Sequence, residues 1–259
     1  MSTHIVIGDS HSNPQTSNDR FEVLGKFVVD TLPDVIIDMG DWASMDSLSS
    51  YDRGKKAFEG RRYTADIQTA RDARDRFDRP IREYNAQRKK NKERQYRPRK
   101  IALLGNHEDR INRVCETSPE LDGVISTKDL GAEEYGWTVY PFLDIVIVDG
   151  VAYSHYFGTG VKQLPAGGEN PAHRLINTQF MSSTSGHLHL RDFHERTSPD
   201  GRRIIGLFPG CYLDPNQYEE YAGNANLMWW KGVVVCKDVE NGTYNPNFVS
   251  INELYRRYY

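Results

Sequence analysis

The stretch KIALLGNHED, residues 100–109, joins an apolar run to a dense group of polar side chains. The apolar run ends at Gly105, and Asn106, His107 and Glu108 follow without a break. A short β-rich run that ends in a glycine predicts a strand, and the glycine lets the backbone turn sharply towards a ligand. The stretch therefore predicts a buried strand whose end presents an amide, an imidazole and a carboxylate to a site.

Two earlier stretches end in the same way. THIVIGD (3–9) and DVIIDMGD (34–41) are β-rich and each ends in Gly–Asp. Between them, residues 18–32 carry apolar side chains at helical spacing, with Asn18 as the expected N-cap; residues 108–115 again look helical. This alternation predicts an α/β fold with parallel strands, and sites in such sheets lie beyond the carboxyl ends of the strands.

The second half of the sequence has a different texture. After about residue 136, short β-rich runs such as DIVIVDG, RRIIGLF and KGVVVCKD alternate with turn residues, which predicts a half dominated by strands. The sequence shows no internal repeat. We therefore expect one domain that spans residues 1–259, and the sequence does not indicate an oligomeric state.

Composition excludes several classes of protein. The chain has 259 residues, 38% of them hydrophobic, and no run approaches the ~18 apolar residues of a membrane span. The beginning MSTHIVIGDS has no basic region followed by an apolar one, so we expect no signal peptide. Three widely spaced cysteines argue against a disulfide framework. We expect a cytoplasmic protein without membrane contact.

Potential metal ligands stand at five predicted strand ends. In chain order they are Asp9 and His11, Asp41, Asn106 and His107, His155, and His187 and His189. One Gly–Asp alone is typical of a turn, and one histidine alone is typical of a structural residue. Five such strand ends together indicate a metal site, and ligands of this kind suit zinc, manganese, iron or nickel.

The ordered set D-x-H, G-D, G-N-H-E, H and G-H-x-H resembles the pattern of the calcineurin-like metallophosphoesterases over residues 9–189. The resemblance implies the metallophosphoesterase fold, an α/β/β/α β-sandwich of two mixed sheets flanked by helices. It also implies two divalent transition-metal ions, with manganese as the first choice and zinc, iron or nickel as alternatives. Small phosphoesterases carried by bacterial viruses show the same general resemblance.

The resemblance assigns seven ligands to the two ions. The first ion would take Asp9, His11 and His189, the second would take Asn106, His155 and His187, and both would share Asp41. A hydroxide between the ions would attack the phosphorus.

The resemblance also makes His107 the catalytic histidine, placed to protonate the leaving oxygen or to hold the phosphoryl group. The sequence leaves open whether Glu108 or Asp109 orients this imidazole or only adds acid to the first turn of the next helix. Arg110 is a candidate for binding the substrate, and the alternative is a solvated helix arginine.

The residues after Asp41 depart from the protein Ser/Thr phosphatase branch. That branch carries G-D-x-x-D-R-G, whereas Ser44 and Met45 stand here in place of the acid and the arginine, and Leu104 replaces an arginine before G-N-H. We therefore expect a phosphodiesterase that hydrolyses nucleic acid or a nucleotide, with a distant resemblance to the SbcD nuclease branch. The alternatives are a phosphomonoesterase for small molecules or proteins, and a non-catalytic nucleic-acid-binding module on the same fold.

A basic segment separates two of these motifs. Residues 51–100 hold 18 Lys and Arg against 8 Asp and Glu, in a chain with a net charge of −3. An apolar stripe from Tyr63 to Tyr84 predicts a basic helical insertion at about 60–97, kinked or divided at Pro80. Residues 61–100 could bind nucleic acid and feed it to the metal site. The alternative is a solvated helical cap with ion pairs such as Arg71–Asp75 and Arg74–Asp78.

Overall fold

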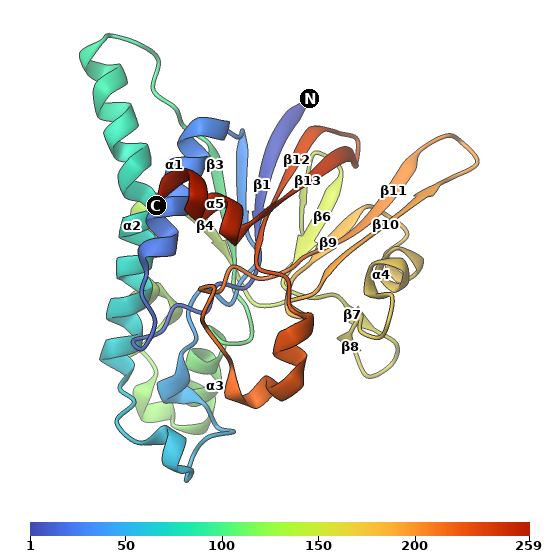
Figure 1. Ribbon diagram of the computed structural model, residues 1–259. Helices are drawn as coiled ribbons and strands as arrows, with labels where there is room; N and C mark the ends of the chain where they lie inside the picture. Colours follow the sequence, from blue (N-terminus) through green and yellow to red (C-terminus); the bar gives the residue numbers. More distant parts are fainter.

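Figure 1 shows a computed structural model of the protein, which describes the backbone of residues 1–259 and all side chains except those of residues 57, 220 and 221. The structure is mixed α/β, with two large sheets that each contain parallel and antiparallel strand pairs. The first sheet has the order β13 (Thr243–Ser250), β12 (Gly232–Glu240), β1 (Ser2–Ile7), β2 (Val35–Asp38), β3 (Arg99–Leu103) and β4 (Trp137–Tyr140). The second has the order β10 (Arg191–Thr197), β11 (Arg203–Pro209), β9 (Ser183–Ser185), β6 (Val151–Ser154) and β5 (Val146–Val148). A small hairpin pairs β7 (Gly158–Thr159) with β8 (Leu164–Pro165).

Alternation along the strands of the first sheet supplies two separate cores. Ile5 and Ile36 point to one face and pack with helices α1 (Asp19–Thr31), α2 (Tyr63–Lys90) and α5 (Ile251–Tyr258). Val6 and Ile37 point to the other face and pack against the second sheet. Helix α4 (Pro171–Gln179) covers the outer face of the second sheet, so the sheets lie between two helical layers (Figure 1).

Strand register aligns the ends that carry the predicted ligands. In the first sheet β1, β2 and β3 are parallel, and Ile7 pairs with Asp38, which in turn pairs with Ala102. In the second sheet β6 and β9 are parallel, and Ser154 pairs with Ser185. The predicted parallel α/β arrangement of the first half is confirmed. The strand-rich second half is confirmed too, although β12 and β13 return to the first sheet.

Helix α2 belongs to the core instead of forming an appended arm. It runs without division through Pro80, so of the two alternatives expected at that proline, a kink or a division, the division is wrong. The helix ends at Lys90, short of the predicted limit. Ala73 and Phe77 are buried against α1. The two helices approach so closely that a Cβ on Gly25 would lie 2.2 Å from the backbone oxygen of Phe77.

The two ion pairs named from the sequence of α2 do not form between these described side chains. Arg71 binds Glu134 at 2.5 Å. Arg74 instead forms a buried pair with Asp38 at 2.6 Å, and its guanidinium lies over the ring of Trp42. Other i,i+4 pairs take their place: Arg76–Asp72, Arg79–Asp75 and Arg82–Asp78. The positive charge along the middle of α2 is thus largely compensated.

The most basic stretch lies at the edge of the sheet opposite to the predicted site. Residues 88–98 precede β3, whereas Asn106 and His107 follow it. Four steps of ~3.3 Å along β3 separate these two edges by about 13 Å. In Figure 1 the loop after α2 lies at the top of the view, whereas α3 (Arg110–Thr117), which follows His107, lies near the bottom. Residues 88–98 therefore do not adjoin the predicted metal site.

Three further expectations concern the cap of α1, the cysteines and the absence of a membrane span. Asn18 occupies the cap position of α1, but its side chain binds Asp72 and the backbone oxygen of Thr69 instead of the helix end. The three cysteines are all free. Among the described residues, no helix combines the length and the apolar composition that a membrane crossing requires.

Candidate metal centre

Five strand ends from both sheets converge on one buried cluster. Asp9 follows β1, Asp41 follows β2, Asn106 follows β3, His155 follows β6 and His187 follows β9, each within three residues of its strand. Because all five strands present their carboxyl ends at one edge, the predicted ligands meet there.

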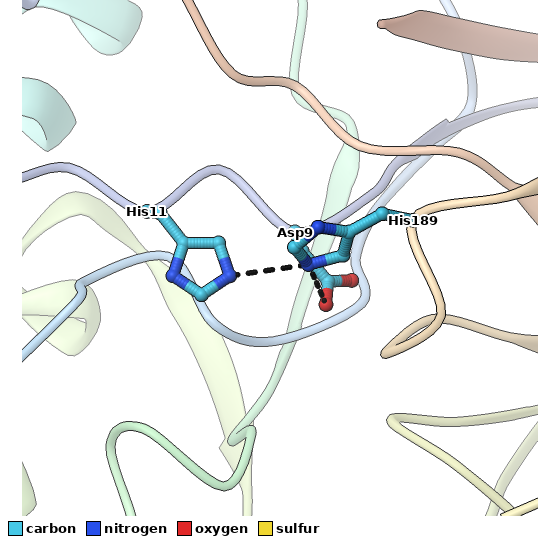
Figure 2. Close-up of side chains that lie close together, drawn as sticks. All are labelled: Asp9, His11 and His189. Atoms are coloured by element: carbon cyan, nitrogen blue, oxygen red, sulfur yellow. Dashed lines mark hydrogen bonds and ion pairs between the residues drawn. The ribbon is translucent and has the colours of Figure 1, made fainter. Parts of the chain in front are cut away.

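The first group contains Asp9, His11 and His189. His189 Nε2 lies 3.1 Å from Asp9 Oδ2 and 3.2 Å from His11 Nε2 (Figure 2). All three side chains are almost completely buried. One ligand atom from each residue lies within 4.8 Å of the others, so the group could hold a metal ion.

The second group contains Asp41, His155 and His187, with Asn106 beside them. His155 Nε2 lies 3.4 Å from Asp41 Oδ2 and 3.0 Å from Asn106 Oδ1. His155 Nδ1 faces the backbone oxygen of Met39 at 2.8 Å. That oxygen can only accept, so the proton is on Nδ1, and the Nε2 lone pair faces the carboxylate. A lone pair and a carboxylate oxygen that face each other suit a cation between them.

Asp41 connects the two groups. Its Oδ2 atom lies 3.8 Å from His11 Nε2 in the first group and 3.4 Å from His155 Nε2 in the second. Its Oδ1 atom accepts the backbone N–H of His107 at 2.9 Å. One carboxylate therefore stands between two clusters of potential ligands.

The backbone at the site is strained. Four of the predicted ligands have a positive φ: His11 (45°), Asp41 (52°), His187 (69°) and His189 (58°). L-residues with a side chain seldom adopt this conformation, which costs about 1–3 kcal/mol each and persists where the surroundings enforce it. Such strain concentrates at functional sites, and it is a signal that the sequence did not reveal.

Two glycines permit the close approach of the strand ends. A Cβ on Gly105 would lie 2.0 Å from Asp41 Oδ1, so any other residue would displace the central carboxylate. Gly40 has a φ of 97°, and a Cβ there would lie 2.8 Å from His155 Nδ1. The glycines that marked the strand ends in the sequence are thus required by packing.

His107 lies beside both groups, and it forms a third potential metal group with His11 and Asp41. A backbone oxygen orients its imidazole. Its Nδ1 donates to the backbone oxygen of Ser44 at 2.7 Å, so in the neutral imidazole Nε2 carries no proton. Nε2 lies 3.9 Å from Asp41 Oδ2. Arg110 Nη2 lies 3.4 Å from the same Nε2, and Arg110 Nη1 donates to the oxygen of Ser44 at 2.8 Å. Arg110 thus lies at the site, next to the imidazole.

Neither acid after His107 orients the imidazole, which corrects both suggestions made for that role. Glu108 is buried and accepts the backbone N–H groups of Asp41 at 3.0 Å, Ala43 at 2.9 Å and Gly105 at 2.8 Å. It joins the end of β2 to the end of β3. Asp109 pairs with Arg113 at 3.3 Å. Sequence reasoning missed the role of Glu108 because its partners are backbone groups of other segments.

Burial and nearby positive groups favour the neutral form of three of these imidazoles, those of His11, His107 and His187. Burial, with the nearby His107, holds the pKa of His11 well below its usual range, and burial with Arg110 does the same for the pKa of His107. Burial also lowers the pKa of His187 to about 4. Neutral imidazoles offer the lone pairs that a metal ion needs, so these side chains fit the predicted ions.

The pKa values of the three buried acids, Asp9, Asp41 and Glu108, shift in different directions. Burial opposes ionisation of Asp9, but the charge and hydrogen bond of His189 lower the pKa of Asp9 below its usual range. Burial and the nearby Asp9 raise the pKa of Asp41 well above its usual value. Burial and Asp41 raise the pKa of Glu108 to about 7. Two acids in one buried cluster favour a cation that offsets their repulsion.

Aromatic side chains border the cluster, and sequence reasoning did not find them. The ring of Trp229 lies 4.2 Å from that of His189, and the ring of Tyr156 lies 5.0 Å from that of His187. A single aromatic residue far along the chain gives no signal in the sequence. The three other histidines lie elsewhere: His4 binds Tyr153, and the rings of His173 and His194 are 4.7 Å apart.

Comparison with models of known families and with curated proteins finds no match for this chain. The case for a function therefore depends on the geometry of the site and on the motif resemblance.

Proposed function

We propose that this protein is a metal-dependent phosphoesterase of the calcineurin-like type, with the metallophosphoesterase fold and a site for two divalent transition-metal ions. Manganese is our first choice for the metal. The observation that carries the proposal is the position of Asp41 between two clusters of buried imidazoles and acids. A protein that only needed a packed core would have no use for facing acceptors at five strand ends, with a strained backbone at three of them.

Each ligand would act through an atom that already faces the cluster. Asp9, His11 and His189 would hold one ion, and Asn106, His155 and His187 would hold the other, with Asp41 shared between them. When bound, two divalent ions polarise a phosphoryl oxygen and lower the pKa of a bound water to ~7. The seven residues supply only two carboxylates, so the loaded site keeps a positive charge and favours an anionic substrate.

His107 would act on the substrate without holding a metal. Its Nδ1 proton is committed to the backbone oxygen of Ser44, and its Nε2 points towards Asp41 and Arg110. From there the imidazole can exchange a proton with the leaving oxygen or contact the phosphoryl group. Arg110, fixed by the Ser44 oxygen, is placed to bind the phosphoryl oxygens with its second nitrogen.

We propose a phosphodiester as the substrate. The chain has Ser44 and Met45 where protein phosphatases carry an acid and an arginine, and here a backbone oxygen orients the catalytic histidine. Binding of nucleic acid through residues 61–100 stays a prediction. Because residues 88–98 lie at the opposite edge of the sheet, a contact through those residues would be separate from the metal site.

The test is hydrolysis by protein reconstituted with Mn²⁺, Zn²⁺, Fe²⁺ or Ni²⁺. We expect the enzyme to cleave bis(p-nitrophenyl) phosphate faster than p-nitrophenyl phosphate, and elemental analysis to find two ions per chain. His173→Ala is the matched control, because His173 lies outside the cluster. Failure of every metal to support cleavage of either ester would contradict the proposal, and faster cleavage of the monoester would redirect it to phosphomonoesters.

A further inference from the structure

A cavity of about 570 Å³ opens directly beside the predicted metal ligand Asn106. Its walls come from the loop after η1 (Asp46–Leu48) and from helix α3 (Arg110–Thr117). Arg53, Arg110 and Arg113 line it, and Glu116 is the one carboxylate among its lining residues. The cavity therefore carries a net positive charge next to the site.

This cavity continues into the space in front of His107. An adjoining cavity of about 310 Å³ is lined by His107 and shares Ser49, Tyr51 and Arg110 with the first. Each of the two acids in its wall is paired with an arginine: Asp52 with Arg61 at 2.7 Å, and Asp46 with Arg110 at 3.5 Å. A ligand held at His107 can thus extend past Arg110 into the basic cavity.

The three arginines differ in how they are held. Arg110 donates to the backbone oxygen of Ser44 and faces His107. We therefore assign it to the phosphate group that reacts. Arg113 donates to the backbone oxygen of Asn106 at 2.5 Å and pairs with Asp109, yet 53% of its side chain is exposed. Arg53 is exposed and takes part in no ion pair of the described side chains.

We propose that this cavity binds a second phosphate group of the substrate through Arg53 and Arg113. This inference depends on the proposed phosphodiesterase function and narrows it to substrates with the chemistry of a nucleotide or an oligonucleotide, in which another phosphate lies near the scissile one. Arginine suits this task because its guanidinium forms paired hydrogen bonds with phosphate oxygens. Arg113 is already positioned by Asn106, so little ordering is needed when the phosphate binds.

The experiment compares the thymidine dinucleotides pTpT and TpTp, which carry a terminal phosphate, with TpT, which does not. We expect the native enzyme to cleave at least one of the phosphorylated forms with a kcat/KM higher by about tenfold or more, the scale of a hydrogen bond to a charged group. The combined substitution Arg53→Gln and Arg113→Gln should bring this ratio close to one, mainly through a higher KM. Arg113→Lys should keep part of the preference.

The matched control is Arg202→Gln with Arg257→Gln, which removes two exposed, ion-paired arginines outside the site and outside residues 61–100 and should leave the ratio as in the native enzyme. Decathymidylate then identifies the source of the second phosphate: a further gain over pTpT supports an oligonucleotide, and no gain supports a nucleotide. Equal cleavage of all three dinucleotides, or an unchanged ratio in the double variant, would overturn the inference. If bis(p-nitrophenyl) phosphate is still hydrolysed in that case, the proposed function stands and only the inference fails.

Discussion

The two edges of the first sheet differ in how deeply their ionisable side chains are buried and in what those side chains face. At the carboxyl edge, acids and imidazoles are mostly buried and face one another, and four of these residues have a positive φ. At the amino edge, the lysines and arginines of residues 88–99 are mostly exposed, and those on the middle of α2 pair with acids one turn away. The comparison teaches that buried, unpaired acceptors mark the site, whereas a high density of charge in the sequence does not.

We expect the largest effect from a substitution at the centre of the carboxyl edge. Asp41→Ala should abolish phosphodiester hydrolysis and reduce bound metal, because it removes the carboxylate that both groups share. Arg97→Ala at the amino edge is the control and should keep both. Elemental analysis and an assay with bis(p-nitrophenyl) phosphate measure the two outcomes. A variant that lacked Asp41 but retained two ions would show that the bridging role is wrong.

His107→Ala separates catalysis from metal binding within the same edge. We expect a loss of ~10²–10⁴ in kcat, the usual scale for a positioned proton donor, with the metal content unchanged. His173→Ala removes a histidine from another part of the molecule and should leave kcat as it was. Loss of metal from the His107 variant would place this residue among the ligands, as its distance of 3.9 Å from Asp41 Oδ2 allows.

Glu108→Gln tests how the strand ends are joined. The substitution places an amide where the carboxylate accepts three backbone N–H groups, so some of these donors lose their partner. We expect the free energy of unfolding to fall by about 1–3 kcal/mol, the cost of one buried donor left without a partner. Asp109→Asn, next in the chain, should cost less than about 1 kcal/mol because its ion pair is at the surface. Urea unfolding of the two variants gives the comparison, and equal effects would refute the joining role.

Charge reversal at the amino edge should have the smallest effect on catalysis. With Arg88, Lys89, Lys90 and Lys92 changed to glutamate, hydrolysis of bis(p-nitrophenyl) phosphate should change less than about twofold at 0.1 M salt, because the site lies beyond one Debye length of ~10 Å. Binding of a polynucleotide to the same variant tests the prediction that residues 61–100 bind nucleic acid. If the segment binds nucleic acid, affinity should fall and its salt dependence should flatten by up to about one unit per lost phosphate contact. A large change in small-ester hydrolysis would mean that the two edges are coupled.

Local patterns predicted those elements whose formation depends on neighbouring residues. The strands before Gly8, Gly40 and Gly105 and the helix over 18–32 follow from alternation, helical spacing and breaking residues. The stripe from Tyr63 to Tyr84 likewise predicted α2, although burial against α1 keeps that helix continuous past Pro80. Tertiary packing therefore outweighed the local cost of the proline.

The sequence by itself determined which side chains meet, because a polar residue after a buried parallel strand must emerge at the shared carboxyl edge. It could not determine what each side chain binds there. Ser44 orients His107 through a backbone oxygen, Glu108 binds amides at the ends of β2 and β3, and Arg74 pairs with Asp38 instead of its helical neighbour. These partners lie far away along the chain or belong to the backbone, which has the same groups at nearly every residue. Only the tertiary structure brings them within hydrogen-bonding distance, and only it places the basic stretch at the opposite edge, since β3 carries the chain across the sheet between them.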